Sequence, residues 1–223
     1  DKDWIIAILH HAPYTGYNGN NSDNNTKEKL MRENMVPILE AASVDLVMYG
    51  HSHVYQRSML INGHYGISAT FDPDVMALDI GDGRTDGDSP YVKSIGGPDD
   101  GKGTVYLCAG AAGPLSENHI LDHPVMYHNN SAVNGSLGLK INGLELSGYY
   151  IDINGNIDDH FTIIKQVEPP IVDMLNPTNG TYYEDIEEII ISADASDSDG
   201  TVTQVEFFVN NNSVGTDFAA PYS

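Results

Sequence analysis

The sequence predicts an α/β domain with a parallel strand pair, followed by a small β-sandwich. Two observations predict this order. Segments of strand length at residues 4–9 and 45–49, apolar except for Asp45, flank a segment with helical periodicity. This is the strand–helix–strand pattern of a parallel crossover unit. After residue 170, short alternating segments are separated by turns rich in Asp, Ser and Gly, as in a small β-sandwich.

The charge distribution supports a boundary at Glu168-Pro169-Pro170, which would divide the chain into residues 1–167 and 168–223. The chain has 32 acidic and 10 basic residues and a net charge of -22. All the basic residues precede the boundary, and 11 acidic residues follow it. Such an acidic surface repels phosphate backbones, which argues against nucleic-acid binding through a basic patch. No apolar run approaches the ~20 residues that a membrane span needs.

The first domain begins with Trp4 to Leu9, a continuous apolar run typical of a strand buried on both faces. Thr26 could cap a helix over Lys27 to Ala42, in which Pro37 predicts a kink or an early stop. Asp45 to Tyr49 is a second buried strand, and Gly50 ends it. Because the carboxyl ends of parallel strands meet at one sheet edge, ligand-binding residues are expected there.

The rest of this domain has mainly β patterns. QRSMLINGHYG predicts a hairpin around Asn62-Gly63, and residues 81–103 are rich enough in Gly, Asp and Pro to predict a long loop. Gly103 to Ala109 predicts another buried strand, in which the single cysteine, Cys108, would act as a small buried hydrophobe. Leu144 to Ile164 predicts a strand pair that turns at Asn154-Gly155.

Three histidines follow the two apolar strands. His10 comes directly after the first strand, and His51 and His53 form a G-H-x-H motif with Gly50. In an extended segment the two histidines of this motif would lean to the same side, and the glycine would allow a close approach of the backbone. A single histidine is more often a satisfied core residue or a solvated loop residue. With His10 at the neighbouring strand end, metal ligation is favoured.

At these residues the chain resembles the C-terminal half of the catalytic domain of a calcineurin-like metallophosphoesterase, and most of all the purple acid phosphatase branch. WIIAILHHAPY and VDLVMYGHSHVYQR carry the resemblance, and KGTVYLCAGAAG and LELSGYYIDINGNIDDHFTIIK are similar to the branch's closing strands. The similarity spans about residues 3–165. It implies part of an α/β/β/α sandwich and hydrolysis of phosphate esters by two metal ions, with Fe, Zn or Mn expected.

The resemblance also implies roles for single residues. The family's V-x-x-H element falls on Ala7 to His10, with Ala in place of Val. It implies that His10 and His51 bind one metal and that His53 binds the other. His10 is preferred to His11 because it keeps the family's spacing from Trp4 and to Tyr14. His11 would then be an outer-shell residue or a phosphate contact.

Other polar residues near these motifs have two interpretations each. Arg57 could contact the phosphate, and a structural ion pair is the equal alternative. Three further histidines could form part of the rim of the site, although a solvated loop is the simpler interpretation; they are His119, His123 and His128.

The sequence departs from the family in one respect. The family takes its remaining ligands from D-x-H or D-x-G, G-D-x-x-[DY] and G-N-H elements that precede the first histidine, and none of these precedes His10 here. We therefore expect the chain to be a fragment that carries part of the metal site. The alternative is a secreted adhesion or scaffold protein in which a phosphoesterase-like domain has lost catalysis and only binds.

The region from Pro170 resembles a bacterial Ig-like module of secreted multidomain proteins, through P-x-V-x-x-x-x-P-x-N-G, S-D-S-D-G-T and the final APYS. Because resembling modules continue beyond APYS, this one could be incomplete. The resemblance implies an extracellular, periplasmic or cell-surface location, with possible contacts to a cell surface or a polysaccharide. Asp194, Asp197 and Asp199 could bind calcium, but a plain acidic turn is the favoured interpretation.

Overall fold

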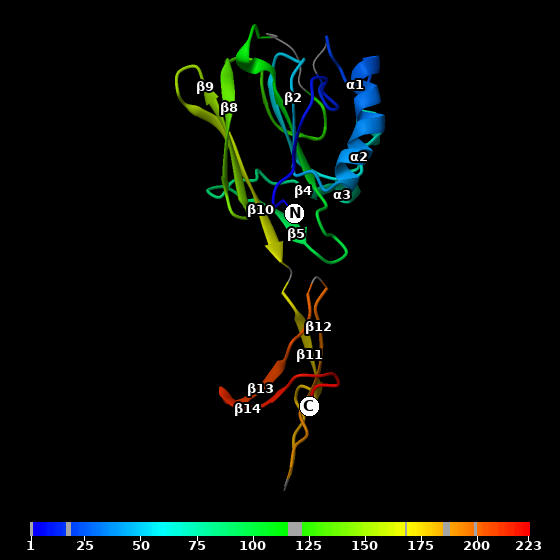
Figure 1. Cartoon of the computed structure of the whole chain (residues 1–223), viewed down its shortest axis with the longest axis vertical. Coiled ribbons are helices and arrows are strands. Elements are labelled where there is room, and N and C mark those ends of the chain that lie inside the picture. Colours follow the sequence, from blue (N-terminus) through cyan, green and yellow to red (C-terminus); the bar gives the residue numbers. More distant parts are fainter. Residues whose placement is uncertain (1, 17–18, 116–121, 168, 185–187, 199) are drawn as a thin grey trace. The chain divides into compact units, whose positions relative to one another are not determined.

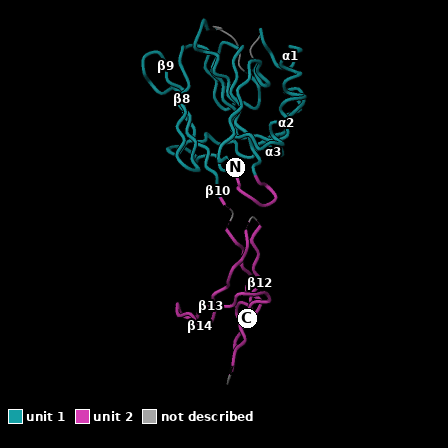
Figure 2. Tube along the Cα trace, in the orientation of Figure 1, with its two compact units in different colours: residues 1–93, 101–166 teal, residues 94–100, 167–223 magenta. Residues whose placement is uncertain are grey.

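The computed structural model describes residues 2–16, 19–115, 122–167, 169–184, 188–198 and 200–223 (Figure 1). The chain divides into two compact units (Figure 2). Unit 1 comprises Asp1–Lys93 and Gly101–Gln166, and unit 2 comprises Ser94–Asp100 and Val167–Ser223. The sequence boundary at 168–170 stays a prediction. No helix within the described ranges is both long enough and apolar enough to span a membrane.

Unit 1 contains a six-stranded mixed sheet in the order β1-β2-β6-β3-β4, with β7 also paired to β3. Its strands are β1 (Ile6–Ile8), β2 (Leu46–Tyr49), β3 (Tyr55–Ile61), β4 (Ala77–Asp79), β6 (Thr104–Ala109) and β7 (Met126–Asn130). β1 and β2 are parallel with Ile6 opposite Leu46, and β2 is parallel to β6. The predicted parallel pair is therefore confirmed.

A second, four-stranded sheet has the order β5-β10-β9-β8. It is formed by β5 (Tyr91–Ile95), β8 (Gly135–Asn142), β9 (Glu145–Asp152) and β10 (Ile157–Val167). β9 and β10 are antiparallel and turn at Gly155, whose φ of 86° requires the left-handed conformation that glycine adopts easily. The strand pair predicted over residues 144–164 is thus confirmed.

The predicted helix forms as three consecutive segments: α1 (Thr26–Leu30), the π-helical η1 (Met31–Met35) and α2 (Val36–Ala41). Its N-cap is Asn25, whose side chain accepts from the Lys27 backbone N–H, so the prediction of Thr26 as cap was wrong by one residue. The helix does not stop at Pro37, which lies in the first turn of α2, directly after the π-helical segment.

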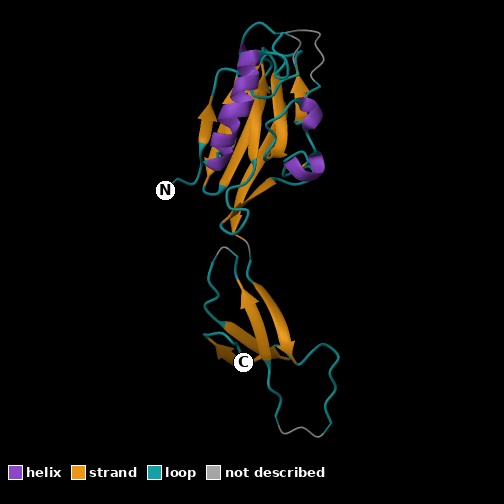
Figure 3. Cartoon of the chain, turned by 90° about the vertical axis from the view of Figure 1, so that its right-hand side faces the viewer, coloured by secondary structure: helices purple, strands orange, loops and turns teal. Residues whose placement is uncertain are grey.

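Alternate residues of the central strands enter two different apolar clusters. Val47, Tyr49, Tyr106 and Cys108 belong to a cluster with Val36 of the helix. Leu46, Val105 and Leu107 belong to a cluster with Leu146, Phe161 and Ile163 of the second sheet. The six-stranded sheet is thus covered by the helix on one face and by the second sheet on the other (Figures 1 and 3). The full α/β/β/α sandwich stays a prediction.

Two local predictions in unit 1 were wrong. The segment 81–103 is not one long loop, because β5 lies within it and buries alternate side chains, Tyr91 and Lys93. Asn62-Gly63 does not make a short hairpin: β3 pairs with β4 after a connection that contains the short helices η2 (Ser68–Thr70) and α3 (Pro73–Met76). A third short helix, η3 (Gly110–Ala112), follows β6.

Unit 2 consists mainly of two antiparallel strand pairs, β11 (Ile171–Asn176) with β12 (Ser192–Ser196) and β13 (Val205–Val209) with β14 (Asn212–Asp217). Its small core is formed by Ala193, Phe207 and Tyr222, and an isolated bridge joins Ala193 to Tyr222. Of the predicted acidic cluster, Asp194 lies on β12 and Asp199 lies outside the described residues.

Candidate metal centre

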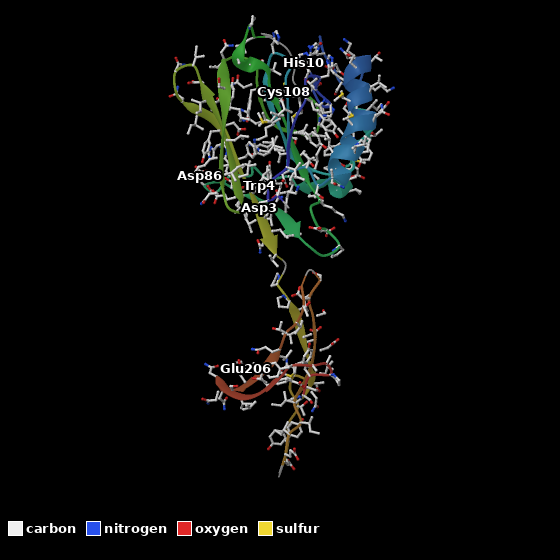
Figure 4. The ribbon with its side chains drawn as sticks, viewed as in Figure 1. Asp3, Trp4, His10, Asp86, Cys108 and Glu206 are labelled. Atoms are coloured by element: carbon white, nitrogen blue, oxygen red, sulfur yellow. The ribbon has the colours of Figure 1, made fainter. Side chains whose placement is uncertain are left out.

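Two adjacent parallel strands bring histidines to the same edge of the sheet. β1 continues as an irregular extension in which Leu9 N–H donates to the Met48 carbonyl at 2.8 Å, and Gly50 N–H donates to the His10 carbonyl at 3.3 Å. His10 and His51 therefore leave the sheet side by side. Figure 4 shows His10 at the end of unit 1 opposite to Trp4, at the same end as Cys108.

The turn after β2 is tight and gives His51 an unusual backbone conformation. Ser52 N–H donates to the Gly50 carbonyl and Val54 N–H donates to the Ser52 carbonyl, both at 2.8 Å. His51 has a φ of 65°, in the left-handed region that few residues other than glycine occupy. The expectation of an extended segment, with both motif histidines leaning to one side, was therefore wrong, because the chain bends at His51.

The structure brings together His10, His11 and His51. His51 Nδ1 lies 3.1 Å from His10 Nε2. The ring centroids are 4.9 Å apart for His10 and His11, 5.0 Å for His10 and His51, and 4.5 Å for His11 and His51. One ligand nitrogen of each ring lies within 4.8 Å of the other two. In the described residues, this is the one group of three or more His, Cys, Asp or Glu side chains that is so compact.

The electrostatic environment of His11 and His51 favours neutral imidazoles. Burial lowers the pKa of His11, and the charges of His51, His10 and Lys27 lower it further. Burial also lowers the pKa of His51, with further contributions from His10, Lys27 and His53. Neutral imidazole is the form that binds a metal, because its ring nitrogen then offers a lone pair.

His53 lies outside the three-histidine group. Its side chain is exposed, although it is close enough for its charge to affect His51. Its assignment to a second metal stays a prediction.

The turn that carries His51 and His53 rests on the end of β6. The Cys108 thiol donates to the Ser52 carbonyl at 3.3 Å and lies 3.7 Å from the Gly50 carbonyl. Cys108 is fully buried, as predicted, and burial raises the pKa of its thiol to about 12. A Cβ on Gly110 would lie 1.9 Å from the Ser52 carbonyl oxygen, whereas one on Gly50 would meet no atom within 4 Å. Gly110 therefore allows the end of β6 to lie close to the turn. The approach of a metal at Gly50 stays a prediction.

Arg57 is fully buried, and Asp159 of the second sheet neutralises it. Arg57 Nε and Nη2 donate to the two carboxylate oxygens at 2.6 and 2.9 Å, and Tyr55 and Arg84 also donate to that carboxylate. These contacts lower the pKa of Asp159 to about 2. Of the two interpretations of Arg57, the geometry favours the structural ion pair, because a buried and fully paired guanidinium has no donor facing solvent.

The two rim histidines that the structure describes, His123 and His128, do not share a loop. His123 is buried and its ring lies 5.5 Å from that of Tyr14; burial lowers the pKa of His123 to about 3. His128 lies on β7, 3.3 Å from Asp158. His119 lies outside the described residues.

The donors fit a transition metal ion. Two nitrogens bound to one ion at ~2.0–2.1 Å in tetrahedral geometry are roughly 3.3 Å apart, and the distance from His10 Nε2 to His51 Nδ1 is 3.1 Å. Imidazole nitrogen suits Zn, Fe, Cu and Ni, which includes the Fe and Zn that the resemblance implies. His11 Nδ1 is buried and has no hydrogen-bond partner among the described residues, so a ligand would satisfy it.

Parts of the chain are similar in sequence to purple acid phosphatases. Over 80 residues the chain is 39% identical to purple acid phosphatase 18 of Arabidopsis thaliana, an alignment that covers 36% of this chain and 16% of the relative. Over 55 residues it is 44% identical to probable purple acid phosphatase 20 of the same organism, covering 24% of this chain and 12% of the relative. The chain thus spans a small part of the length of these relatives.

A solved structure and a family model extend the comparison. The fold resembles that of purple acid phosphatase PPD1 from yellow lupin (Lupinus luteus) seeds, with a TM-score of 0.54 and 18% identity over 73% of this chain and 25% of that chain. Residues 170–223 match the family model described as a bacterial Ig domain. The chain contains a purple acid phosphatase-like metallophosphoesterase region. An Ig-like module follows it.

Proposed function

We propose that this chain carries part of a binuclear metal centre that hydrolyses phosphate esters, as in an acid phosphatase. The approach of His10 and His51 to 3.1 Å at two adjacent strand ends carries the proposal, together with the purple acid phosphatase-like sequence around them. In this proposal His10 and His51 hold one metal ion and His53 holds the second. Metal ions bound there would polarise the phosphoryl group and lower the pKa of water.

The residues of this chain contribute position and charge. Burial keeps the pKa of His51 low, so that its imidazole is neutral and available as a ligand. The Asn20 amide donates to the His51 carbonyl at 3.3 Å and Cys108 donates to the Ser52 carbonyl, so the turn is held from two sides. Lys27 places a positive charge near the imidazoles, which offsets the repulsion of a phosphate ester by a protein of charge -22.

The alternative function, a non-catalytic adhesion or scaffold protein, is not favoured by the similarity to phosphatases. The proposed location is extracellular, periplasmic or at the cell surface, which the bacterial Ig-like module supports. Contacts of this module with a cell surface or a polysaccharide belong to the same proposal.

A phosphate-binding titration tests the proposal. Inorganic phosphate is titrated calorimetrically into the 223-residue chain with and without one equivalent of Zn²⁺. We expect phosphate to bind only with Zn²⁺ and to lose that binding in His51→Ala. The control is His160→Ala, which removes an imidazole that contacts Asp86 and lies outside the three-histidine group. Phosphate binding that ignores Zn²⁺, or that survives in His51→Ala, would contradict the proposal.

A turnover assay complements the titration. Two metal ions need roughly twice the number of ligands that His10, His51 and His53 supply, including a bridging carboxylate. We therefore expect the 223-residue chain alone to hydrolyse p-nitrophenyl phosphate slowly or not at all. Rapid hydrolysis by metal-free protein would refute a metal-dependent mechanism.

A further inference from the structure

We propose that His11 is a third direct ligand, so that His10, His11 and His51 hold one metal ion without any residue from outside this chain. The inference rests on the proposed function only in treating His10 and His51 as ligands. It assigns to His11 a place in the coordination sphere, whereas the family resemblance implies at most an outer-shell or phosphate-contacting role.

The first step is the path of the chain at His10 and His11. Consecutive residues of a strand point to opposite faces of the sheet, so two neighbouring histidines in a continuing strand would diverge. Here β1 ends at Ile8, and the backbone bends at both His10 and His11. Their ring centroids consequently lie 4.9 Å apart, and both rings face His51.

The second step is the anchoring of the segment that follows. Ala12 and Tyr14 are fully buried, and Tyr49 Oη donates to the Tyr14 carbonyl at 2.9 Å. The chain on both sides of His11 is therefore tied to the six-stranded sheet, by the Gly50 to His10 hydrogen bond before it and by Tyr14 after it. A ligand held in this way meets the requirement of a metal site for rigid donors.

The third step concerns the partners of the His11 ring. An outer-shell histidine makes a hydrogen bond that orients a ligand, but His11 Nδ1 is buried and has no partner in the described part of the chain. An unpartnered buried nitrogen costs free energy unless something binds it.

The fourth step is the kind of ion. Three histidines with a free fourth position are the donor set of catalytic zinc sites, where water or substrate completes a tetrahedron. His10 is exposed while His11 and His51 are partly buried, so the group is open to solvent on the side of His10. We therefore expect one Zn²⁺ or Co²⁺ per chain, with the three imidazoles and solvent as ligands.

Cobalt spectroscopy of the 223-residue chain tests the role of His11 directly. Co²⁺ in a site of low coordination number gives visible d–d bands, and a thiolate ligand adds a sulfur-to-cobalt charge-transfer band. With one equivalent of Co²⁺ under reducing conditions, His11→Cys is expected to show the charge-transfer band. His160→Cys is the control and is expected to show none, because His160 contacts Asp86 and lies outside the group. Cys108 is fully buried and lies outside the three-histidine group, so it is expected to contribute no band.

Affinity separates a ligand from an outer-shell residue. Loss of an outer-shell partner typically weakens metal binding by roughly 10- to 100-fold. We expect His11→Ala to weaken Co²⁺ binding by more than that and to change the intensity of the d–d bands. Circular dichroism of the metal-free variants checks that each one folds.

Three outcomes are distinguishable. A charge-transfer band in His11→Cys, together with weak binding by His11→Ala, supports the inference. A His11→Ala variant with wild-type spectra, alongside His10→Ala and His51→Ala variants that lose binding, overturns the role of His11 and leaves the proposed function in place. A wild-type chain that binds no Co²⁺ overturns both.

Discussion

Gly110 lies against the turn that carries His51 and His53, and its replacement by alanine is expected to disturb that turn. The added Cβ would lie 1.9 Å from the Ser52 carbonyl oxygen and 2.9 Å from its carbonyl carbon, whereas ordinary contacts begin at 3.4 Å. The turn must therefore move by about 1.5 Å. Because the obstacle is backbone, no side-chain rotation relieves the contact. Overpacking of this kind typically costs about 1–3 kcal/mol of unfolding free energy.

The same movement affects the metal site. Metal–ligand distances are defined to within about ±0.2 Å, so a displacement of His51 relative to His10 by a large part of 1.5 Å prevents both nitrogens from binding one ion well. We expect Gly110→Ala to weaken Zn²⁺ binding by at least about tenfold, which corresponds to ~1.4 kcal/mol. The Cys108 hydrogen bond to the Ser52 carbonyl would be lost as well.

Urea unfolding of the metal-free chain and Zn²⁺ calorimetry measure the two effects separately. Gly113→Ala is the matched control, because a Cβ there meets no atom within 4 Å and its φ of -114° is open to any residue. It should match the wild type in both assays. If Gly110→Ala equals Gly113→Ala in stability and Zn²⁺ affinity, the end of β6 does not hold the turn of His51 and His53 in place.

Three further predictions concern the rest of the fold. Arg57→Leu leaves the Asp159 carboxylate buried and is expected to lower the free energy of unfolding in urea by about 3–5 kcal/mol. Arg84 is a partly exposed partner of the same carboxylate, and a decrease no larger than that of Arg84→Leu would contradict this prediction. The pKa of Asp159 in the folded chain, about 2, lies below its value in the unfolded chain, so the ionised carboxylate stabilises the fold by on the order of 2 kcal/mol. This stabilisation is present above pH ~4 and is lost as the pH falls towards 2. If the stability of the wild type and of Asp159→Asn falls in parallel on acidification, this prediction is wrong. Limited proteolysis should cut within a few residues of Gln166 to Pro170 and release an acidic piece. If residues 168–223 are instead protected from cleavage, the two parts of the chain form one folded unit.

The sequence predicted those parts of the fold whose burial is visible in the pattern of apolar residues. The run at 46–49 is apolar at every position because β2 faces apolar clusters on both sides. The prediction that strand 4–9 is buried on both faces was wrong, since Ile5 and Ile8 are 41% and 77% exposed and β1 is at the end of the strand order. β7 was not predicted, because its partner β3 lies far along the chain. Pairing between distant segments leaves little trace in a local pattern. β8 was also missed, although it pairs with β9 directly after it and its alternating Leu137, Leu139 and Ile141 were an available signal.

The candidate site was predictable to the same extent. The convergence of His10 and His51 followed from two parallel strands that end together. The bend at His51 could not be predicted from the sequence, since its φ of 65° depends on contacts with β6. The proximity of His11 had only the doubled histidine as a signal, and the ion pair of Arg57 joins residues 102 positions apart.

The central claim is that the ends of β1 and β2 form a metal site. A crystal structure of the 223-residue chain grown with Zn²⁺, with anomalous diffraction recorded on both sides of the zinc edge, tests it most directly. We expect an anomalous peak at ~2.0–2.1 Å from one ring nitrogen of His10 and one of His51. Bound zinc at other residues only, with His10 and His51 still in contact through their rings as they are here, would contradict it.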